Sequence, residues 1–223
     1  MNLISRPNEG LLMNLPPIPT GALARAQALL ALGGRRVLGI AAPPGAGKST
    51  LAAQLLDALG TQAQVVPMDG FHLANSELQR LGRAGRKGAQ DTFDAAGYVH
   101  LLRRIREQKA GETIYAPEFR RELEEGIAGA IAVHSDVRLI ITEGNYLLLE
   151  SAPWDAVRGL LDEAWYLAPD DAERQRRLLE RHMRFGRDRA DALHWIEVTD
   201  EPNARLVAAT RHRADWVIGP MSA

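Results

Sequence analysis

A glycine-rich stretch, APPGAGKST at residues 42–50, follows the apolar run 37–41 and precedes the helical pattern 51–56. It therefore lies where a strand turns into a helix. Small residues at such a turn let successive backbone N–H groups point inward, and the helix N-terminus adds the positive end of its dipole. A lysine at the position of Lys48 reaches the outer phosphates of a nucleotide. The stretch predicts that the chain binds a nucleoside triphosphate, although Ala42 stands where the strict motif has Gly.

A carboxylate follows the second apolar run, because Asp69 comes directly after residues 64–68 and precedes Gly70. Open α/β sheets bind ligands at the carboxyl ends of their strands, so we expect Asp69 to face the phosphates. There a carboxylate can accept the proton of an acceptor hydroxyl and align that hydroxyl for phosphoryl transfer. An Asp-Gly pair is also common in turns, but the place after the second strand favours the catalytic role. His72 stays open between a substrate contact and a packing or capping role.

A second carboxylate, Glu143, follows the apolar run 138–142 and precedes Gly144. A carboxylate at this edge is typical of one that helps to hold Mg²⁺ or its water shell. The hydroxyl of Ser49, in the phosphate loop, is suited to the same ion. We therefore expect Ser49 and Glu143 to form the metal site, with direct and water-mediated contact of Glu143 left open. A plain strand-ending turn is the alternative for Glu143.

Four arginines fall along one stripe of a helix that Asp170 is expected to cap and that runs to about His182: Arg174, Arg177, Arg181 and Arg184. Charged helix faces are usually only solvated. Beside a phosphate loop, however, arginines of a closing lid can neutralise the charge that develops on a transferred phosphoryl group. Arg177 and Arg181 are the pair that we expect to act in this way.

The elements that must position these residues follow from five apolar runs, at 37–42, 64–68, 138–142, 164–168 and 215–218. Helical patterns separate the runs, which is typical of a parallel sheet with helices on both faces. The sequence thus predicts an α/β fold of the P-loop NTPase type, with a five-stranded parallel sheet and a helical arginine lid. Helices are expected at 21–32, from the phosphate loop to Leu59, around Tyr98–Ile105 and at 171–182.

Three further segments complete the predicted organisation. Residues 1–20 contain four prolines and predict an irregular arm, whereas residues 21–223 predict one domain. The segment 82–93, rich in Gly, Arg and Lys, predicts a mobile loop over one side of the site. The sequence at Asp200, followed by Glu201 and Pro202, predicts a helix start that Asp200 caps.

The composition bounds the class of protein. The chain has 223 residues, of which 46% are hydrophobic and 25% charged, which fits one globular domain. Its net charge of -1 argues against general binding to nucleic acid or to anionic membranes. The absence of cysteine excludes disulfides and suits a reducing compartment. No apolar run approaches the roughly 18 residues of a membrane span, and no signal-peptide pattern occurs, so we expect a cytoplasmic protein.

Together the motifs resemble the family of P-loop small-molecule kinases that includes uridine kinase, phosphoribulokinase and bacterial pantothenate kinase. The similarity is to its nucleoside/nucleotide kinase-like branch, which includes candidate sugar kinases associated with fructose transport. It spans residues 36 to 218 and is carried by APPGAGKST (42–50), PMDGFH (67–72), TEGNYLLLE (142–150), PW (153–154), RLLERHMRFG (177–186) and DEPNA (200–204).

The resemblance implies roles for particular residues and an ATP-dependent reaction with Mg²⁺. It implies phosphate contacts by Gly45, Ala46, Gly47, Lys48, Ser49 and Thr50, with Asp69 as the base, Glu143 near the metal, and Arg177 and Arg181 in the lid. Residues 115–121 are similar to the acceptor-side segment of the family, but they lack the Asp that commonly follows its aromatic residue.

The resemblance implies a kinase that transfers the γ-phosphoryl group of ATP to a hydroxyl of a small metabolite. A nucleoside, a sugar, a pantothenate-like acid and a phosphorylated sugar all stay open as acceptors, as does the choice between ATP and GTP. A nucleotide-dependent switch or ATPase that acts on a protein partner is the alternative. The chain lacks the Asn/Thr-Lys-x-Asp motif expected of a guanine-specific switch. The oligomeric state is also open, and a homo-oligomer is compatible with these residues.

Overall fold

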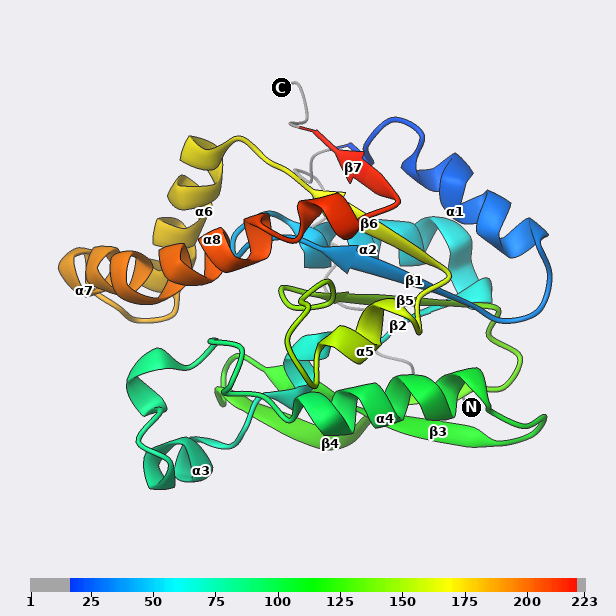
Figure 1. Cartoon of the computed structure of the whole chain (residues 1–223), viewed down its shortest axis with the longest axis horizontal. Helices are drawn as coiled ribbons and strands as arrows, with labels where there is room; N and C mark the ends of the chain where they lie inside the picture. The colour runs from blue at the N-terminus through cyan, green and yellow to red at the C-terminus, as the bar shows by residue number, and fades with distance from the viewer. Residues whose placement is uncertain (1–16, 220–223) are drawn as a thin grey trace, which may run out of the picture.

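The computed structural model describes residues 17–219, which contain a five-stranded parallel sheet covered by helices (Figure 1). The strand order is β2-β5-β1-β6-β7, so β1 is central. The strands are β1 (Arg36–Ala41), β2 (Ala63–Val65), β5 (Leu139–Gly144), β6 (Glu163–Leu167) and β7 (Trp216–Ile218). All five predicted strands are present, but β2 ends at Val65 rather than at the predicted Met68, where a 3₁₀ turn (Met68–Phe71) begins. The predicted arm 1–20 lies outside the described residues except for 17–20.

The helices are α1 (Ala22–Ala31), α2 (Lys48–Leu59), α3 (Asn75–Arg80), α4 (Ala95–Arg106), α5 (Asp155–Arg158), α6 (Asp171–Arg184), α7 (Arg189–Trp195) and α8 (Glu201–Ala208). The Asp170 side chain accepts the Glu173 N–H at 3.0 Å, which confirms the predicted cap of α6. In Figure 1 the helices α6, α7 and α8 lie together at one end of the sheet.

The two faces of the sheet bury alternate residues of each strand. Leu38 and Ile40 pack in a core with residues of α1 and α2. Val37 and Ala41 belong to the opposite core, which includes residues of α4 and α5. Because both faces are covered, the strands appear in the sequence as continuous apolar runs rather than as alternating patterns.

An antiparallel hairpin of β3 (Thr113–Arg120) and β4 (Glu125–His134) was not predicted. It packs below the sheet next to α4 (Figure 1). The hairpin also lies directly against the turn that carries Asp69. A Cβ at Gly70 would lie 2.3 Å from the carbonyl oxygen of Pro117, so only glycine fits at this contact. The Asp-Gly pair therefore has a packing reason in addition to its turn geometry.

The predicted helix start is confirmed, since α8 begins at Glu201, but the predicted cap by Asp200 is wrong. A π-helical turn, Ile196–Asp200, joins α7 to α8 in one run, and Asp200 has helical φ -69° and ψ -40° without a side-chain cap. Pro202 lacks an N–H and its ring crowds the preceding turn, and a wider π turn accommodates such a residue. The Asp200 carboxylate instead contacts His182 of α6, with 2.7 Å between Oδ2 and Nε2.

Candidate active site

The phosphate loop connects β1 to the N-terminus of α2. Gly45 and Gly47 have φ of +81° and +94°, in the left-handed region that favours glycine. At Gly45 there is also no room for a side chain, because a Cβ would lie 2.7 Å from Cγ of Leu178 in α6. The loop therefore has the tight turn that the sequence predicts, and α6 packs directly on it.

Lys48 and Ser49 begin α2 and contact residues at the end of β5. The Lys48 ammonium donates to Oδ1 of Asn145 at 2.6 Å. The Ser49 hydroxyl donates to Oε1 of Glu143 at 2.9 Å. Glu143 is only 4% exposed, and burial together with the Asp69 carboxylate raises its pKa. Burial also lowers the pKa of Lys48. A carboxylate and an ammonium are thus held close together in a poorly solvated place.

Asp69 lies on the short 3₁₀ turn that follows β2. Its carboxylate lines the same cavity as Lys48 and Ser49. The closest cation is Arg121, at the tip of the hairpin, with 3.9 Å between Nη2 and Oδ2 of Asp69. That separation is too long for a hydrogen bond. The Asp69 carboxylate therefore faces the cavity with room for a hydroxyl to approach.

His72 packs beside the Asp69 turn. Its Nδ1 is 2.7 Å from the backbone oxygen of Asp69, and because a carbonyl only accepts, Nδ1 carries the proton. Burial lowers its pKa, so the ring is neutral near neutral pH. Its centroid lies 4.0 Å from that of Phe93 and 4.6 Å from that of Phe119. His72 thus has a packing role, while it also lines the cavity.

The four arginines of the stripe make different contacts. Arg174 is 2% exposed, and its guanidinium binds Asp171, Glu201 and the carbonyl of Pro44. Arg177 donates to Glu173 at 2.8 Å, and its Nη1 would lie 3.7 Å from a Cβ at Gly47.

Arg181 lines the cavity and makes no hydrogen bond or ion pair within residues 17–219. Burial, followed by the charge of Arg121, lowers its pKa. Arg184, the last arginine of the stripe, is exposed at the end of α6. The four arginines therefore differ in environment although they share one helix.

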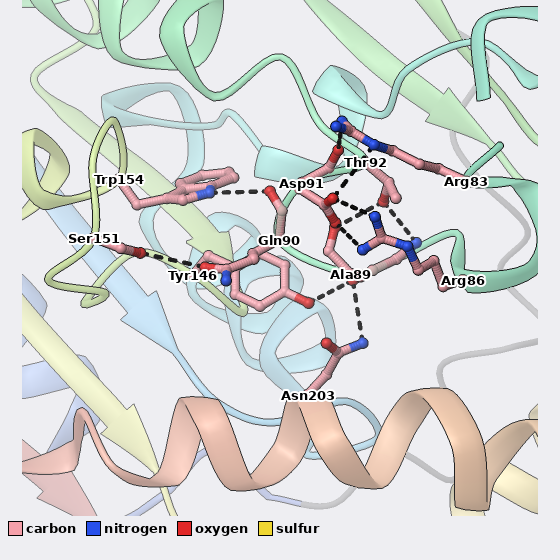
Figure 2. Close-up of polar contacts among 11 residues, drawn as sticks. Arg83, Arg86, Ala89, Gln90, Asp91, Thr92, Tyr146, Ser151, Trp154 and Asn203 are labelled. Atoms are coloured by element: carbon pink, nitrogen blue, oxygen red, sulfur yellow. Dashed lines mark hydrogen bonds and ion pairs between the residues drawn. The ribbon is translucent and has the colours of Figure 1, made fainter. Parts of the chain in front are cut away.

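The segment 82–93 lies over one side of the cavity, where the sequence places it, and Lys87 is among its residues that line the cavity. Its internal contacts centre on Asp91. The guanidinium of Arg86 binds both carboxylate oxygens of Asp91, and Arg83 donates to the Asp91 carbonyl at 2.8 Å (Figure 2). These bonds fold the segment back on itself.

The same segment is tied to the rest of the fold through its backbone carbonyls (Figure 2). Tyr146 donates its hydroxyl to the Gly88 carbonyl, and Trp154 donates Nε1 to the Gln90 carbonyl at 3.1 Å. Asn203 of α8 reaches the same Gly88 oxygen at 3.5 Å. The sequence predicts a mobile loop, and these bonds give its second half a defined position beside the cavity.

The cavity has a volume of about 490 Å³. Of the predicted site residues, Lys48, Ser49, Asp69 and Arg181 line it. Glu143 does not line the cavity itself but accepts a hydrogen bond from Ser49, which does. Gly45, Ala46, Gly47, Thr50 and Arg177 are not among the residues that line the cavity; Gly45 and Gly47 form the adjoining phosphate loop, and Arg177 lies beside Gly47.

Several residues of the cavity were not selected from the sequence. Asn145 follows Glu143 at the same sheet edge, and the argument that selected Glu143 applies to it as well. Arg121 and Phe119 belong to residues 115–121, which the family resemblance marks as the acceptor-side segment, but the hairpin that places them at the cavity was not predicted. Lys87 was included only as part of the segment 82–93, because a basic residue in a glycine-rich loop carries no signal of its own.

The oxygen atoms of Ser49 and Glu143 fit the preferences of Mg²⁺. Within residues 17–219, no three His, Cys, Asp or Glu side chains gather into a complete metal cluster. Mg²⁺ is usually bound by one or two protein oxygens together with substrate phosphates and water. The buried Glu143 carboxylate, with its raised pKa, is a position where an added cation would offset an unfavourable negative charge.

The chain is similar to several proteins of related description. Residues 37–223 match the profile of the Phosphoribulokinase / Uridine kinase family. The ATP-dependent kinase-like protein notR' of Aspergillus versicolor is 35% identical over 152 residues, covering 65% of this chain and 88% of that protein. A candidate uridine kinase of Schizosaccharomyces pombe is 36% identical, covering 73% of this chain and 72% of that protein.

A solved structure is similar to the whole fold. This is a candidate fructose transport system kinase from Silicibacter sp. TM1040, with 36% identity and a TM-score of 0.78. The match covers 87% of this chain and 97% of that one. None of the helices within residues 17–219 combines the length and the apolar character that crossing a bilayer requires.

Proposed function

The chain belongs to the phosphoribulokinase/uridine kinase family of small-molecule kinases, and we propose that it transfers the γ-phosphoryl group of ATP to a hydroxyl of a small metabolite. The observation that carries this proposal is the meeting of three strand ends at one cavity. Lys48 follows β1, Asp69 follows β2, and Glu143, the penultimate residue of β5, contacts Ser49. Phosphoryl transfer needs such positioned charge more than covalent chemistry by the protein.

In the proposed reaction, Asp69 accepts the proton of the acceptor hydroxyl while that oxygen bonds to the γ-phosphorus. The bond between the γ-phosphorus and the bridging oxygen breaks, and ADP leaves with the electron pair. Lys48 and Arg181 donate to the phosphoryl oxygens where negative charge builds up. Mg²⁺, held through Ser49 and Glu143, would neutralise part of the phosphate charge. Arg177, beside Gly47, is suited to the same phosphates from the outer side of the loop.

The alternative is a nucleotide-dependent switch or ATPase that acts on a protein partner. The 490 Å³ cavity next to Asp69 favours transfer to a small acceptor, because such a volume matches a small-molecule pocket. The two functions differ in what stimulates ATP turnover. A kinase turns over ATP when its acceptor is present, whereas a switch does so when its partner is present.

The test is an acceptor panel with Mg-ATP in which ADP formation is measured. Nucleosides, hexoses, pantothenate, glycerate and ribulose phosphate represent the acceptor classes that stay open. Acceptor-dependent ADP formation that Lys48→Ala abolishes supports the proposal, provided that the phosphorylated product is detected by mass spectrometry. ATP hydrolysis at the same rate with and without every acceptor would favour the ATPase.

A further inference from the structure

The cavity beside Asp69 carries more positive than negative side chains. The cations that line it are Lys48, Lys87, Arg121, Arg181 and Arg187. The carboxylates that line it are Asp69, Glu124 and Asp200. Asp200 is already paired with His182 at 2.7 Å. After Lys48 and Arg181 are assigned to the transferred phosphoryl group, three cations (Lys87, Arg121 and Arg187) face three carboxylates, so the contacts of each cation, rather than the net charge, decide whether an anion can bind.

Among the cations on the acceptor side of the cavity, Arg121 is the one whose side chain makes neither a hydrogen bond nor a cation–π contact within residues 17–219. It follows the last residue of β3, and its side chain is 41% exposed. A guanidinium has five N–H donors in a planar fork that matches a carboxylate or a phosphate. The neighbouring Arg120, by contrast, donates to Glu118 at 2.7 Å. Arg121 therefore enters the cavity with its donors unused.

The other two cations of this side are already engaged. The Lys87 ammonium donates to Oδ1 of Asn75 at 2.7 Å and lies 5.2 Å from the centroid of Phe119. The Arg187 guanidinium stacks on Trp195 at 3.9 Å. Both raise the positive potential of the cavity, but neither offers the free fork of Arg121.

Arg121 and Arg181 line the cavity from different elements, the turn of the hairpin and α6. Each carries a positive charge, and the charge of Arg121 is a cause, after burial, of the lowered pKa of Arg181. Two such groups repel each other unless anions separate them. The carboxylates of Asp200, Asp69 and Glu124 already offset part of this repulsion at Arg181, the transferred phosphoryl group would offset more, and a second anion next to Arg121 would add to both.

The aromatic rings next to the Asp69 turn do not favour a nucleobase at that place, whereas Phe185 and Trp195 line the cavity near the end of α6 and in α7. Phe119 already contacts the His72 ring at 4.6 Å between centroids, in addition to the Lys87 ammonium. The Phe93 ring also packs on His72, with 4.0 Å between the two ring centroids. A base that stacks needs an open ring face, and these rings are already packed against one another.

We propose that the acceptor is a small hydroxy compound with an anionic group, either a carboxylate or a phosphate, and that Arg121 binds this group. The proposal rests on the proposed kinase function, since the acceptor hydroxyl is the one that Asp69 deprotonates. Arg121 then determines specificity, because a neutral acceptor leaves its guanidinium without a hydrogen-bonded anion and with only the long, 3.9 Å contact to Asp69. A carboxylate and a phosphate present the same pair of oxygens to the guanidinium, so the two sources are distinguished by experiment.

The test compares matched acceptors that differ in charge, using the full chain at saturating Mg-ATP. The pairs are glycerate with glycerol and pantothenate with pantothenol for the carboxylate, and fructose 6-phosphate with fructose for the phosphate. In the pair that contains the better acceptor, kcat/KM should be higher for the anion. Arg121→Gln should lower the ratio of anionic to neutral kcat/KM by about 10- to 100-fold, the range for a lost hydrogen bond to a charged group. Any effect of Arg121 on Asp69 changes the kcat/KM of the anionic and the neutral acceptor alike, so it cancels in the ratio of the two values.

The control is Arg120→Gln, which removes a charge from the same hairpin without touching the cavity and should leave the ratio unchanged. A second measurement titrates each anion calorimetrically into protein saturated with Mg²⁺ and a non-hydrolysable ATP analogue, so that the phosphate loop is filled. Wild type should bind at least one anion more tightly than its neutral partner, and Arg121→Gln should weaken that binding.

The outcomes separate the two proposals. Equal use of anionic and neutral acceptors, or an unchanged ratio in Arg121→Gln, would overturn the role of Arg121 and leave the kinase intact. Binding of an anion that depends on Arg121, without phosphorylated product, would overturn the proposed function and leave the anion site intact. Failure of every anion to bind in the calorimeter, with no neutral acceptor phosphorylated, would overturn both.

Discussion

Three arginines of α6 should separate into one structural and two catalytic residues when each is replaced by Met. Arg174 is buried against the phosphate loop and α8, whereas Arg177 and Arg181 are partly exposed. Methionine keeps most of the aliphatic stem of arginine and removes only the charge and the donors. Differences among the three variants therefore report what each guanidinium contacts.

The magnitude for Arg174→Met follows from its partners. The ion pair with Asp171 contributes little to the free energy of unfolding, since the Asp171 side chain is 71% exposed. The Glu201 side chain is only 21% exposed, and it loses its charged partner when Arg174 is replaced. A hydrogen bond to a charged group contributes about 1.5–3 kcal/mol, so we expect a loss of about 2–3 kcal/mol in the free energy of unfolding. For a chain of this length that corresponds to about 5–10 °C in Tm.

Arg181→Met and Arg177→Met should instead leave Tm within about 3 °C of wild type, because the pair of Arg177 with Glu173 is partly exposed and Arg181 has no ion pair to lose within residues 17–219. Each should lower kcat, on the order of 10²-fold for Arg181, the scale of a donor lost from a charge-stabilising site. The double variant should lose less than the sum of the single effects, because both guanidiniums serve the same phosphoryl group.

Thermal unfolding and steady-state kinetics on the same preparations measure both quantities. Arg176→Met is the matched control, because Arg176 is an exposed residue of the same helix that, among the described residues 17–219, pairs only with Glu173 and Glu180. It should change neither Tm nor kcat appreciably. An Arg174→Met protein as stable as the control, or an Arg181→Met protein with normal turnover, would refute the division of the stripe.

Three further substitutions test the roles assigned at the strand ends. Lys48→Ala should leave a folded protein, as judged by circular dichroism, with no detectable phosphoryl transfer; normal turnover in this variant would exclude the central role of the phosphate loop. Asp69→Asn should retain Mg-ATP binding and lose about 10²- to 10⁴-fold in kcat, whereas lost nucleotide affinity with unchanged kcat would assign Asp69 to the metal instead. In the Mg²⁺-free protein, the Tm of wild type should rise relative to that of Glu143→Gln as the pH falls, because the pKa of Glu143 is raised, so its ionised form costs stability above that pKa and the cost disappears as the pH falls through it. The same variant should lose Mg²⁺-dependent turnover, and a Tm difference that does not change with pH would contradict the reasoning.

The phosphate side of the site could be predicted because its positions follow from local patterns. Glu143 and Asp69 each come directly after an apolar run, and parallel strands bring their carboxyl ends to one edge. The contact of Ser49 with Glu143, 94 residues apart in the chain, follows from the pairing of β1 with β5. The strand order is therefore enough to predict that Ser49 and Glu143 lie close together.

The hairpin could not be predicted because its strands lack a continuous apolar pattern. Only a few residues of it are fully buried, among them Ile114, Ala116 and Val133. Most of β4 is exposed or half-buried, and it includes glycine and alanine, which have low strand propensity. Packing against α4 and the Asp69 turn therefore decides this structure, and such packing leaves no periodic signal in the sequence.

The nucleotide side and the acceptor side of the site are built from different kinds of segment, and this difference has a functional consequence. The nucleotide side is built from strand ends and the N-terminus of α2, where backbone geometry dictates the residue types. The acceptor side is built from the tip of the hairpin and the segment 82–93, where Arg121, Phe119 and Lys87 are held by contacts between distant segments. Loops of this kind tolerate changes of side chain without loss of the sheet. A single phosphate-transfer framework can thus serve different acceptors, and the acceptor must be inferred from the charges that the hairpin tip and the segment 82–93 place around Asp69 rather than from the motifs that identify the kinase.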